Sequence, residues 1–174
     1  MKHSLALFAL VAVSACSTMT PSDFAASPTP LVLEDYFSGH TKAWGLFEDR
    51  FGTVRRQFTV DMDGTWQGQT LTLDEHFVYT DGERQERVWT IHKIAPGHYQ
   101  GTAADVVGVA EGTAAGNAFH WAYHLNLKTG NDTTEVAFDD WMFLEPGQTI
   151  LNHASVSKFG VDVGSVFLSF RKQP

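Results

Sequence analysis

Hydrophobic and polar residues alternate with a period of two through most of the chain after residue 30. The stretch 118–128 shows this most clearly. Its large apolar side chains fall on one set of alternate positions and its small or polar side chains on the other: Phe119, Trp121, Tyr123, Leu125 and Leu127 against His120, Ala122, His124 and Asn126. Alternation of this kind predicts a β-strand with one buried face and one face in water.

Turn-forming residues divide the chain into about ten such segments. We expect strands near residues 43–50, 53–62, 66–79, 84–94, 98–104, 106–114, 118–128, 133–144, 149–158 and 162–170. Asp63-Gly64 and Asp81-Gly82 are strong hairpin signals, because both residue types adopt positive φ at low cost. Residues 31–37 form the one plausible helical stretch, which ends before Ser38-Gly39.

Consecutive strands joined by tight turns predict an all-β, antiparallel, up-and-down arrangement. A meander of eight or more strands protects its edges by closing into a barrel. We therefore expect residues 31–174 to form a β-barrel domain of about eight to ten strands with a short N-terminal helix. A barrel of this size holds one ligand. A two-sheet sandwich is the main alternative, because turn spacing alone does not separate the two.

Residues 1–15 have the pattern of a signal peptide. Lys2 precedes an apolar run at 5–13, which is far shorter than the ~20 residues needed to cross a bilayer, and small residues follow it. Residues 13–16, Val-Ser-Ala-Cys, resemble the bacterial lipobox, which implies that Cys16 is acylated and becomes the mature N-terminus. The alternative is an ordinary secreted protein with a free cysteine near its cleavage site.

Residues 16–30 would then be a lipidated cysteine and a flexible tether, rich in Ser, Thr, Pro and Ala. Residue 17 is Ser, not Asp. In the lipoproteins that this segment resembles, Asp after the cysteine retains the protein in the inner membrane. The resemblance therefore implies a lipid anchor to the outer membrane, with the protein on its periplasmic face, and acyl chains make such an anchor essentially permanent.

Composition narrows the class of protein. Hydrophobic residues make up 43% of the chain and charged residues 18%, which excludes a disordered chain. Acidic residues outnumber basic residues 20 to 12, so we expect neither nucleic-acid binding nor electrostatic attraction to anionic lipid. The single cysteine excludes an intrachain disulfide.

Metal binding and nucleophilic catalysis both lack a candidate in the sequence. His120 and His124 share a strand face, but residues i and i+4 of a strand lie ~13 Å apart, too far for one metal ion. The chain has no Gly-x-Ser-x-Gly motif, and the anchor would use Cys16. We expect no metal and no cofactor.

Two charged residues fall on the apolar faces of predicted strands. Asp140 is in phase with Phe138, and Arg56 is in phase with Phe58. A buried carboxylate needs a partner, which Arg56 or Arg50 would supply. Such a pair would either lock the barrel or orient the head of a ligand, and general acid–base chemistry is a third use.

Five tryptophans and thirteen phenylalanines supply many large apolar side chains. Aromatic residues that face a barrel interior make apolar cavities with few polar groups, as in lipid-binding pockets, whereas ordinary core packing is the alternative. The candidate ligand-binding residues are four aromatic residues for the walls and two charged residues for the polar end: Trp44, Phe58, Trp121 and Trp141, with Arg56 and Asp140.

Several short motifs are similar to those of an uncharacterised family of proteobacterial lipoproteins, described as lipocalin-like. They are Tyr-Phe-Ser-Gly at 36–39, Ala-Trp-Gly at 43–45, Asp-Arg-Phe-Gly at 49–52, Phe-Asp-Asp-Trp-Met at 138–142 and Phe-Gly-Val at 159–161. The resemblance covers nearly all of residues 31–172. It implies a lipocalin-like barrel and a place in the cell envelope, and it implies no particular activity.

The sequence therefore favours an envelope lipoprotein that binds or carries a hydrophobic molecule, a fatty acid or another lipid, in its barrel. Two other classes stay open: an envelope interaction module with a packed core, and an isomerase or cyclase that acts on a lipid by positioning alone. A small transmembrane barrel is disfavoured, because many positions beside the aromatic faces are charged.

Overall fold

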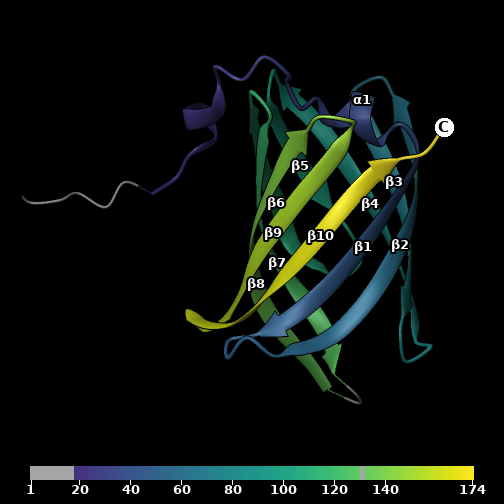
Figure 1. Cartoon of the computed structure of the whole chain (residues 1–174), viewed down its shortest axis with the longest axis vertical. Helices are drawn as coiled ribbons and strands as arrows, with labels where there is room; N and C mark the ends of the chain where they lie inside the picture. Colours follow the sequence, from purple (N-terminus) through teal and green to yellow (C-terminus); the bar gives the residue numbers. More distant parts are fainter. Residues whose placement is uncertain (1–17, 130–131) are drawn as a thin grey trace, which may run out of the picture.

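The structure is a computed structural model that describes residues 18–129 and 132–174. Ten antiparallel strands form one closed barrel, in which each strand pairs with its neighbours in sequence and β1 pairs with β10 (Figure 1). The strands are β1 (Gly39–Asp49), β2 (Val54–Gln67), β3 (Thr70–Tyr79), β4 (Arg84–Ala95), β5 (His98–Thr102), β6 (Val106–Ala115), β7 (Ala118–Thr129), β8 (Asp132–Glu145), β9 (Thr149–Lys158) and β10 (Val161–Lys172). The up-and-down barrel is confirmed, and its closure excludes the sandwich.

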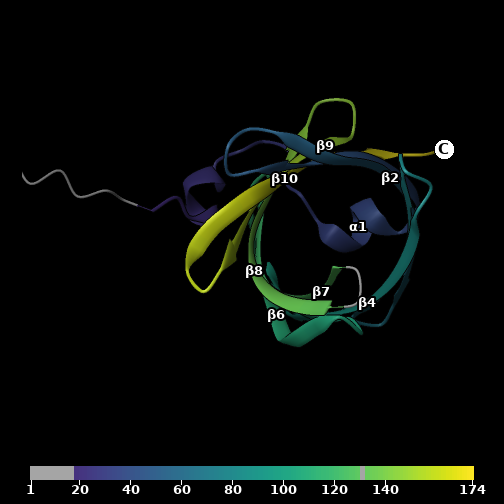
Figure 2. The same ribbon diagram turned by 90° about the horizontal axis from the view of Figure 1, so that it is seen from below.

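A short helix, α1 (Leu33–Phe37), lies inside the ring of strands at one end of the barrel, which we call the upper end (Figure 2). Its Glu34 is buried and accepts hydrogen bonds from Lys93 and, at 2.8 Å, from the Tyr99 hydroxyl. The ammonium of Lys172 donates to three carbonyl oxygens at the other end of the helix, those of Asp35, Tyr36 and Ser38. Side chains from β4, β5 and β10 therefore hold α1 in place.

The expected hairpin at Asp63-Gly64 is wrong. Both residues lie inside β2, and the chain turns at residues 68–69 instead. A Cβ added at Gly64 would lie 1.7 Å from the carbonyl oxygen of Phe37. The glycine is therefore required because the end of α1 crosses β2 in backbone contact, and not because the chain turns there.

The upper half of the interior is filled by apolar side chains. Each of the following inward-facing residues is at most 6% exposed: Ala43, Val60, Met62, Leu71, Leu73, Trp89, Ile91, Tyr99, Phe119, Trp121, Ile150 and Phe170. The Trp121 ring lies against two glycines, since a Cβ at Gly101 or Gly112 would come within 2.7 or 2.2 Å of it. This half is a packed core whose side chains have almost no surface free for a ligand.

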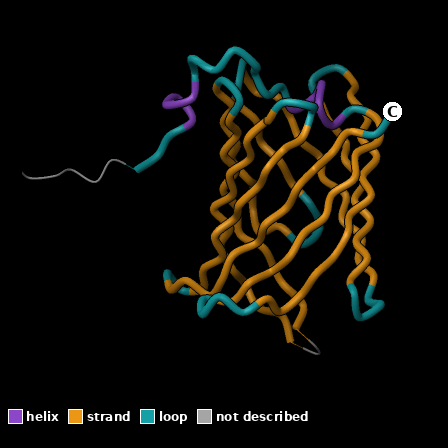
Figure 3. Tube along the Cα trace, in the orientation of Figure 1, coloured by secondary structure: helices purple, strands orange, loops and turns teal. Residues whose placement is uncertain are grey.

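The first described residues, 18–24, lie outside the barrel (Figure 3), whereas Leu31, just before α1, is buried in the core. They include a single 3-10 turn, η1 (Pro21–Phe24), and the Phe24 ring packs 5.1 Å from Phe143 and 6.3 Å from Trp141 on the outer wall. The predicted signal peptide and Cys16 are outside the described residues. No helix in 18–129 or 132–174 is both long enough and apolar enough to cross a bilayer.

Candidate ligand-binding site inside the barrel

Below the packed core, Leu125, Val136 and Val156 form a second, smaller buried cluster, but the other large inward-facing side chains stay only partly buried. We call them the lower interior: Phe47, Phe58, Phe77, Tyr79, Tyr123, Leu127, Phe138 and Val166. Inside a closed barrel, a side chain keeps accessible surface only where the space in front of it is unfilled. The lower interior therefore has room beside its walls, and because α1 closes the upper end, the approach is from the opposite end.

Aromatic rings make up two walls of the lower interior. On β2 and β3 the Phe58 ring lies 5.4 Å from Tyr79 and 6.0 Å from Phe77. On β7 and β8 the rings of Tyr123 and Phe138 stack at 5.1 Å. These two pairs of strands lie opposite each other in the ring of ten, so aromatic surface faces aromatic surface across the barrel.

Polar side chains separate the packed core from the lower interior. We call this group the polar layer: Glu75, Arg87, Asp105, Tyr123, Asp140 and Asn152. Arg87 lies opposite Glu75 in the register of β3 and β4 and donates hydrogen bonds to the Asp105 carboxylate at 2.8–3.1 Å. Its Nη1 is 3.7 Å from Glu75 Oε2, which has no hydrogen-bond donor among the described residues.

The other half of the polar layer comes from β8 and β9. Asp140 and Asn152 are 6% and 5% exposed. The Asn152 amide nitrogen donates to the Asp140 carboxylate and, at 2.9 Å, to the carbonyl oxygen of Trp141. Its amide oxygen, Oδ1, is buried and has no donor in the part of the chain that the structure describes. The polar layer therefore holds two buried acceptor atoms without donors.

The polar layer is short of positive charge. Burial raises the pKa of Glu75 to about 7, although Arg87 acts in the opposite direction. Burial also raises the pKa of Asp140 to about 7, against the hydrogen bond from Asn152. The layer thus holds one guanidinium against three carboxyl groups, and that guanidinium donates hydrogen bonds to one of them, Asp105.

A second arginine lies at the lower rim. The guanidinium of Arg56 sits 3.6 Å above the Tyr79 ring and forms ion pairs with Glu83 at 2.7 Å and Asp81 at 3.2 Å. Both acidic residues belong to the turn between β3 and β4. Arg56 therefore covers an aromatic wall at the end where a ligand would enter.

An apolar groove of about 920 Å³ crosses the wall of the barrel over β1–β3 and β8–β10, and most of its lining side chains point outward, although Phe58, Tyr79 and Asn152 also contribute to it. Its most exposed large residues are Trp44, Leu151 and Phe167, at 46%, 51% and 40%. Phe143 lies at one edge, where Phe24 packs on it. No acidic residue is among the residues that line it.

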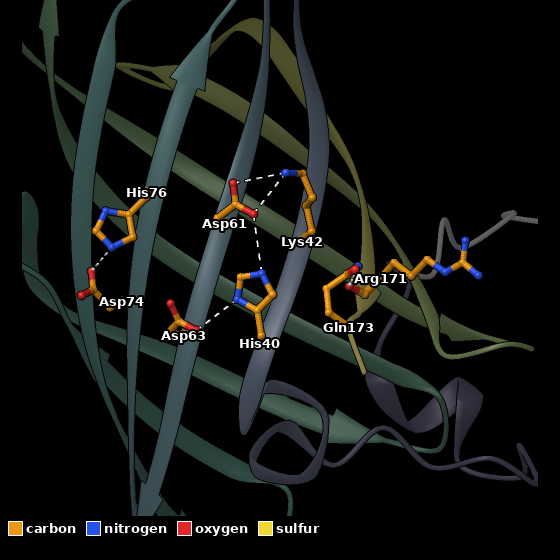
Figure 4. A network of polar contacts seen from close by, with 8 residues as sticks. All are labelled: His40, Lys42, Asp61, Asp63, Asp74, His76, Arg171 and Gln173. Atoms are coloured by element: carbon orange, nitrogen blue, oxygen red, sulfur yellow. Dashed lines mark hydrogen bonds and ion pairs between the residues drawn. The ribbon is translucent and has the colours of Figure 1, made fainter.

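The outer wall of β1, β2 and β3 carries a network of histidines and carboxylates (Figure 4). His40 Nδ1 lies 3.0 Å from Asp63, Lys42 lies 3.2 Å from Asp61, and His76 lies 3.5 Å from Asp74. These side chains are partly exposed, so each pair contributes little to stability. Across the described ranges, no three His, Cys, Asp or Glu side chains gather as a metal ion would require.

Residues 10–172 match the family described as "Protein of unknown function (DUF3833)". The chain belongs to this family. The resemblance to an uncharacterised family is thereby confirmed. A search of the curated proteins found no sequence match.

The barrel of this DUF3833 protein is also similar to a solved structure, that of the S-type phycobiliprotein lyase from Guillardia theta. The TM-score is 0.57, and the match covers 81% of this chain and 90% of that chain, at 8% sequence identity. At this identity the likeness shows a shared fold. What the DUF3833 barrel binds is a separate question, because one fold hosts many functions.

Two of the predicted wall residues lie on the wrong face for an interior site. Trp44 is 46% exposed on the outer wall, and Trp141 stacks on Phe143 and donates to Asp139 there. Trp121 does face inward, but it is buried in the packed upper core. Among the predicted wall residues, only Phe58 lines the lower interior.

The predicted pair of Arg56 with Asp140 is also wrong. Asp140 is buried as expected, but its partner is Asn152, whereas Arg56 pairs with Asp81 and Glu83 at the rim. The reason is position along the strands. Arg56 is near the start of β2, at the lower end of the barrel, and Asp140 is in the middle of β8.

Sequence reasoning missed five members of the polar layer as site residues: Glu75, Arg87, Asp105, Tyr123 and Asn152. The signal for Glu75 was present, because Leu71, Leu73 and Phe77 place it on the inward face of β3. The same reasoning that singled out Asp140 would have found it. That Arg87 pairs with Asp105, in the loop between β5 and β6, follows only from the three-dimensional structure.

Proposed function

We propose that this DUF3833 protein is an envelope lipoprotein whose barrel binds an amphiphilic, mainly apolar small molecule. The ligand lies in the lower interior with its polar end at the polar layer. The observation that carries the proposal is the set of inward aromatic side chains that keep accessible surface and end at buried acceptor atoms without donors. Apolar walls with a few convergent polar groups are typical of small-molecule sites.

The anchor part of the proposal rests on the lipobox resemblance around Cys16. Cells expressing the full chain are fed an alkyne-bearing fatty acid, and the protein is examined for label and for membrane association. We expect the wild-type chain to be labelled and to sediment with membranes, and Cys16→Ser to carry no label. An unlabelled wild-type chain would contradict the anchor and leave the interior site to be judged separately.

Native mass spectrometry tests the interior site. The chain that begins at Ser17 contains every strand of the closed barrel, and it is purified from the periplasm without detergent. We expect a bound small molecule at near one-to-one stoichiometry, which extraction then identifies by class. A protein that is empty and also takes up no added amphiphile would contradict the proposal.

A matched pair of variants locates the binding. Val166→Phe adds volume to the half-buried lower interior, whereas Ser155→Phe adds the same ring on the exposed outer wall of β9. We expect Val166→Phe to lose the ligand and Ser155→Phe to keep it. Equal retention by both variants would place the ligand elsewhere.

The outer apolar groove favours a second candidate function, an envelope interaction module. Trp44, Leu151 and Phe167 expose a contiguous apolar surface, of the kind that marks interaction sites. This candidate gains if the barrel proves empty and Trp44→Ser changes the sedimentation or cross-linking partners of the full chain in cells. This candidate is contradicted if Val166→Phe, and not Trp44→Ser, abolishes the effect of the protein in cells.

A further inference from the structure

The buried acceptors in the polar layer indicate what the ligand's polar end is made of. Glu75 Oε2 and Asn152 Oδ1 have no donor among the described residues. A buried acceptor without a donor costs free energy, so a bound group that donates to it is stabilised. A group that only accepts hydrogen bonds gains nothing from these two atoms.

The arginine of the layer is already engaged by two carboxylates. Arg87 donates from Nε and Nη2 to Asp105, the shortest contact being 2.8 Å, and its Nη1 is the nearest positive group to Glu75. A ligand carboxylate placed there would compete with Asp105 and Glu75 for Arg87, in a layer that holds three carboxyl groups and one guanidinium. An added negative charge is repelled strongly by the carboxylates of the layer where water is excluded.

The walls suit a cation as well. Tyr79, Tyr123 and Phe138 are among the aromatic side chains of the lower interior, and aromatic faces attract ammonium and guanidinium groups. The lower interior already shows this contact, because the Arg56 guanidinium lies 3.6 Å above Tyr79.

We infer that the polar end of the ligand is a hydrogen-bond donor, with a protonated amine bound best, a hydroxyl less well and a carboxylate worst. This inference rests on the proposed function and names the ligand class for the same site. It departs from the fatty acid expected from sequence. Glu75 and Asn152 supply the acceptor atoms for the head, and Glu75 and Asp140 supply the carboxyl groups that disfavour an anion.

Calorimetric titration with three probes of equal chain length tests the inference: dodecylamine, dodecanol and dodecanoate, each below its micellar concentration, at a pH where the amine is protonated and the acid ionised. We expect the amine to bind at least about tenfold more tightly than the acid, the difference expected of one charge-assisted hydrogen bond. Glu75→Gln should weaken the amine by about the same factor and leave the alcohol nearly unchanged.

Glu86→Gln is the matched control, because it removes the same charge from the exposed outer face of β4. Equal weakening of the amine in Glu75→Gln and Glu86→Gln would mean attraction to the acidic surface, and would overturn the inference. Equal or tighter binding of dodecanoate would overturn it too, while leaving the proposed function standing. Failure of all three probes to bind would remove the proposed function itself.

Discussion

Glu75 is a carboxyl group inside the barrel whose oxygen Oε2 is buried without a hydrogen-bond donor among the described residues. It sits inside the barrel between Leu73 and Phe77, with Arg87 opposite, yet the guanidinium donates to Asp105 instead. Natural cores rarely keep an unpaired buried acceptor, so such an atom is informative. Glu75 lies between the packed core and the lower interior, and the proposed polar end of the ligand is placed beside it for this reason.

The raised pKa values of Glu75 and Asp140, both about 7, predict how stability depends on pH. Between an unfolded pKa near 4.5 and a folded pKa of about 7, the folded chain binds more protons than the unfolded chain. Stability therefore falls as pH rises through this window, by up to ~1.4 kcal/mol per pH unit for each group. Urea denaturation at pH 5 and at pH 8 should show the loss.

The variant Glu75→Gln should show a shallower fall between the same two pH values, because it removes one of the two groups. Glu86→Gln, on the outer wall, should keep the wild-type slope. Identical slopes in the wild type and Glu75→Gln would contradict the burial of this carboxyl. Glu34 and Asp49, whose pKa values are lowered, act only in more acidic solution.

The contact between Trp121 and Gly112 gives a second prediction at this scale. A Cβ on residue 112 would lie 2.2 Å from the indole and 2.6 Å from the Phe119 ring. Gly112→Ala should therefore destabilise the barrel by ~1–3 kcal/mol through overpacking. Trp121→Leu should recover part of that loss in the double variant, whereas Glu111→Ala, on the exposed neighbour, should change stability little. Urea denaturation of the four variants decides.

At the scale of elements, α1 closes the upper end of the barrel, and charged side chains of the strands hold it there. Burial alone would raise the pKa of Glu34, but hydrogen bonds from Lys93 and Tyr99 outweigh it and leave the pKa lowered. The helix has only five residues, too few to be stable alone. Its place therefore depends on side chains from the strands.

Replacing Glu34 tests that dependence. Glu34→Gln leaves Lys93 beside a neutral amide, and we expect a loss of ~1–3 kcal/mol in the free energy of unfolding. Asp35→Asn changes the same charge on the exposed side of the helix and should cost much less. Hydrogen exchange of the α1 amides should accelerate in Glu34→Gln alone, and unchanged exchange would contradict the role given to this ion pair.

The strands show how much of the side-chain orientation the local alternation of hydrophobic and polar residues predicts. Strict alternation in β7 predicted which of its side chains face inward, and Tyr123 and Leu125 do. In β1 the rule fails, because Ala43 and Gly45 face inward while Trp44 faces outward. The inward residue must be small here, since the Phe58 ring from β2 fills the space over Gly45. Sequence alone does not contain that long-range contact.

At the scale of the molecule, the barrel has two unequal halves. The sequence was sufficient for the closed up-and-down barrel, because turns and alternation recur along the whole chain. It was not sufficient for the division into a densely packed upper half and a lower half that only a small buried cluster and partly buried side chains fill. That division depends on where rings from distant strands meet, as Trp121 meets Gly101 and Gly112, and on the level at which charged side chains enter the interior.

The barrel has two apolar regions that could bind a ligand, the outer groove and the lower interior. We propose that the ligand occupies the lower interior. A crystal structure of the chain beginning at Ser17, soaked with ω-bromododecylamine, decides between them through the anomalous signal of bromine. We predict a bromine site below the polar layer, beside Tyr123 and Phe138, with the amine near Glu75. A bromine site on the outer wall beside Trp44 and Phe167, or none at all, would contradict the claim.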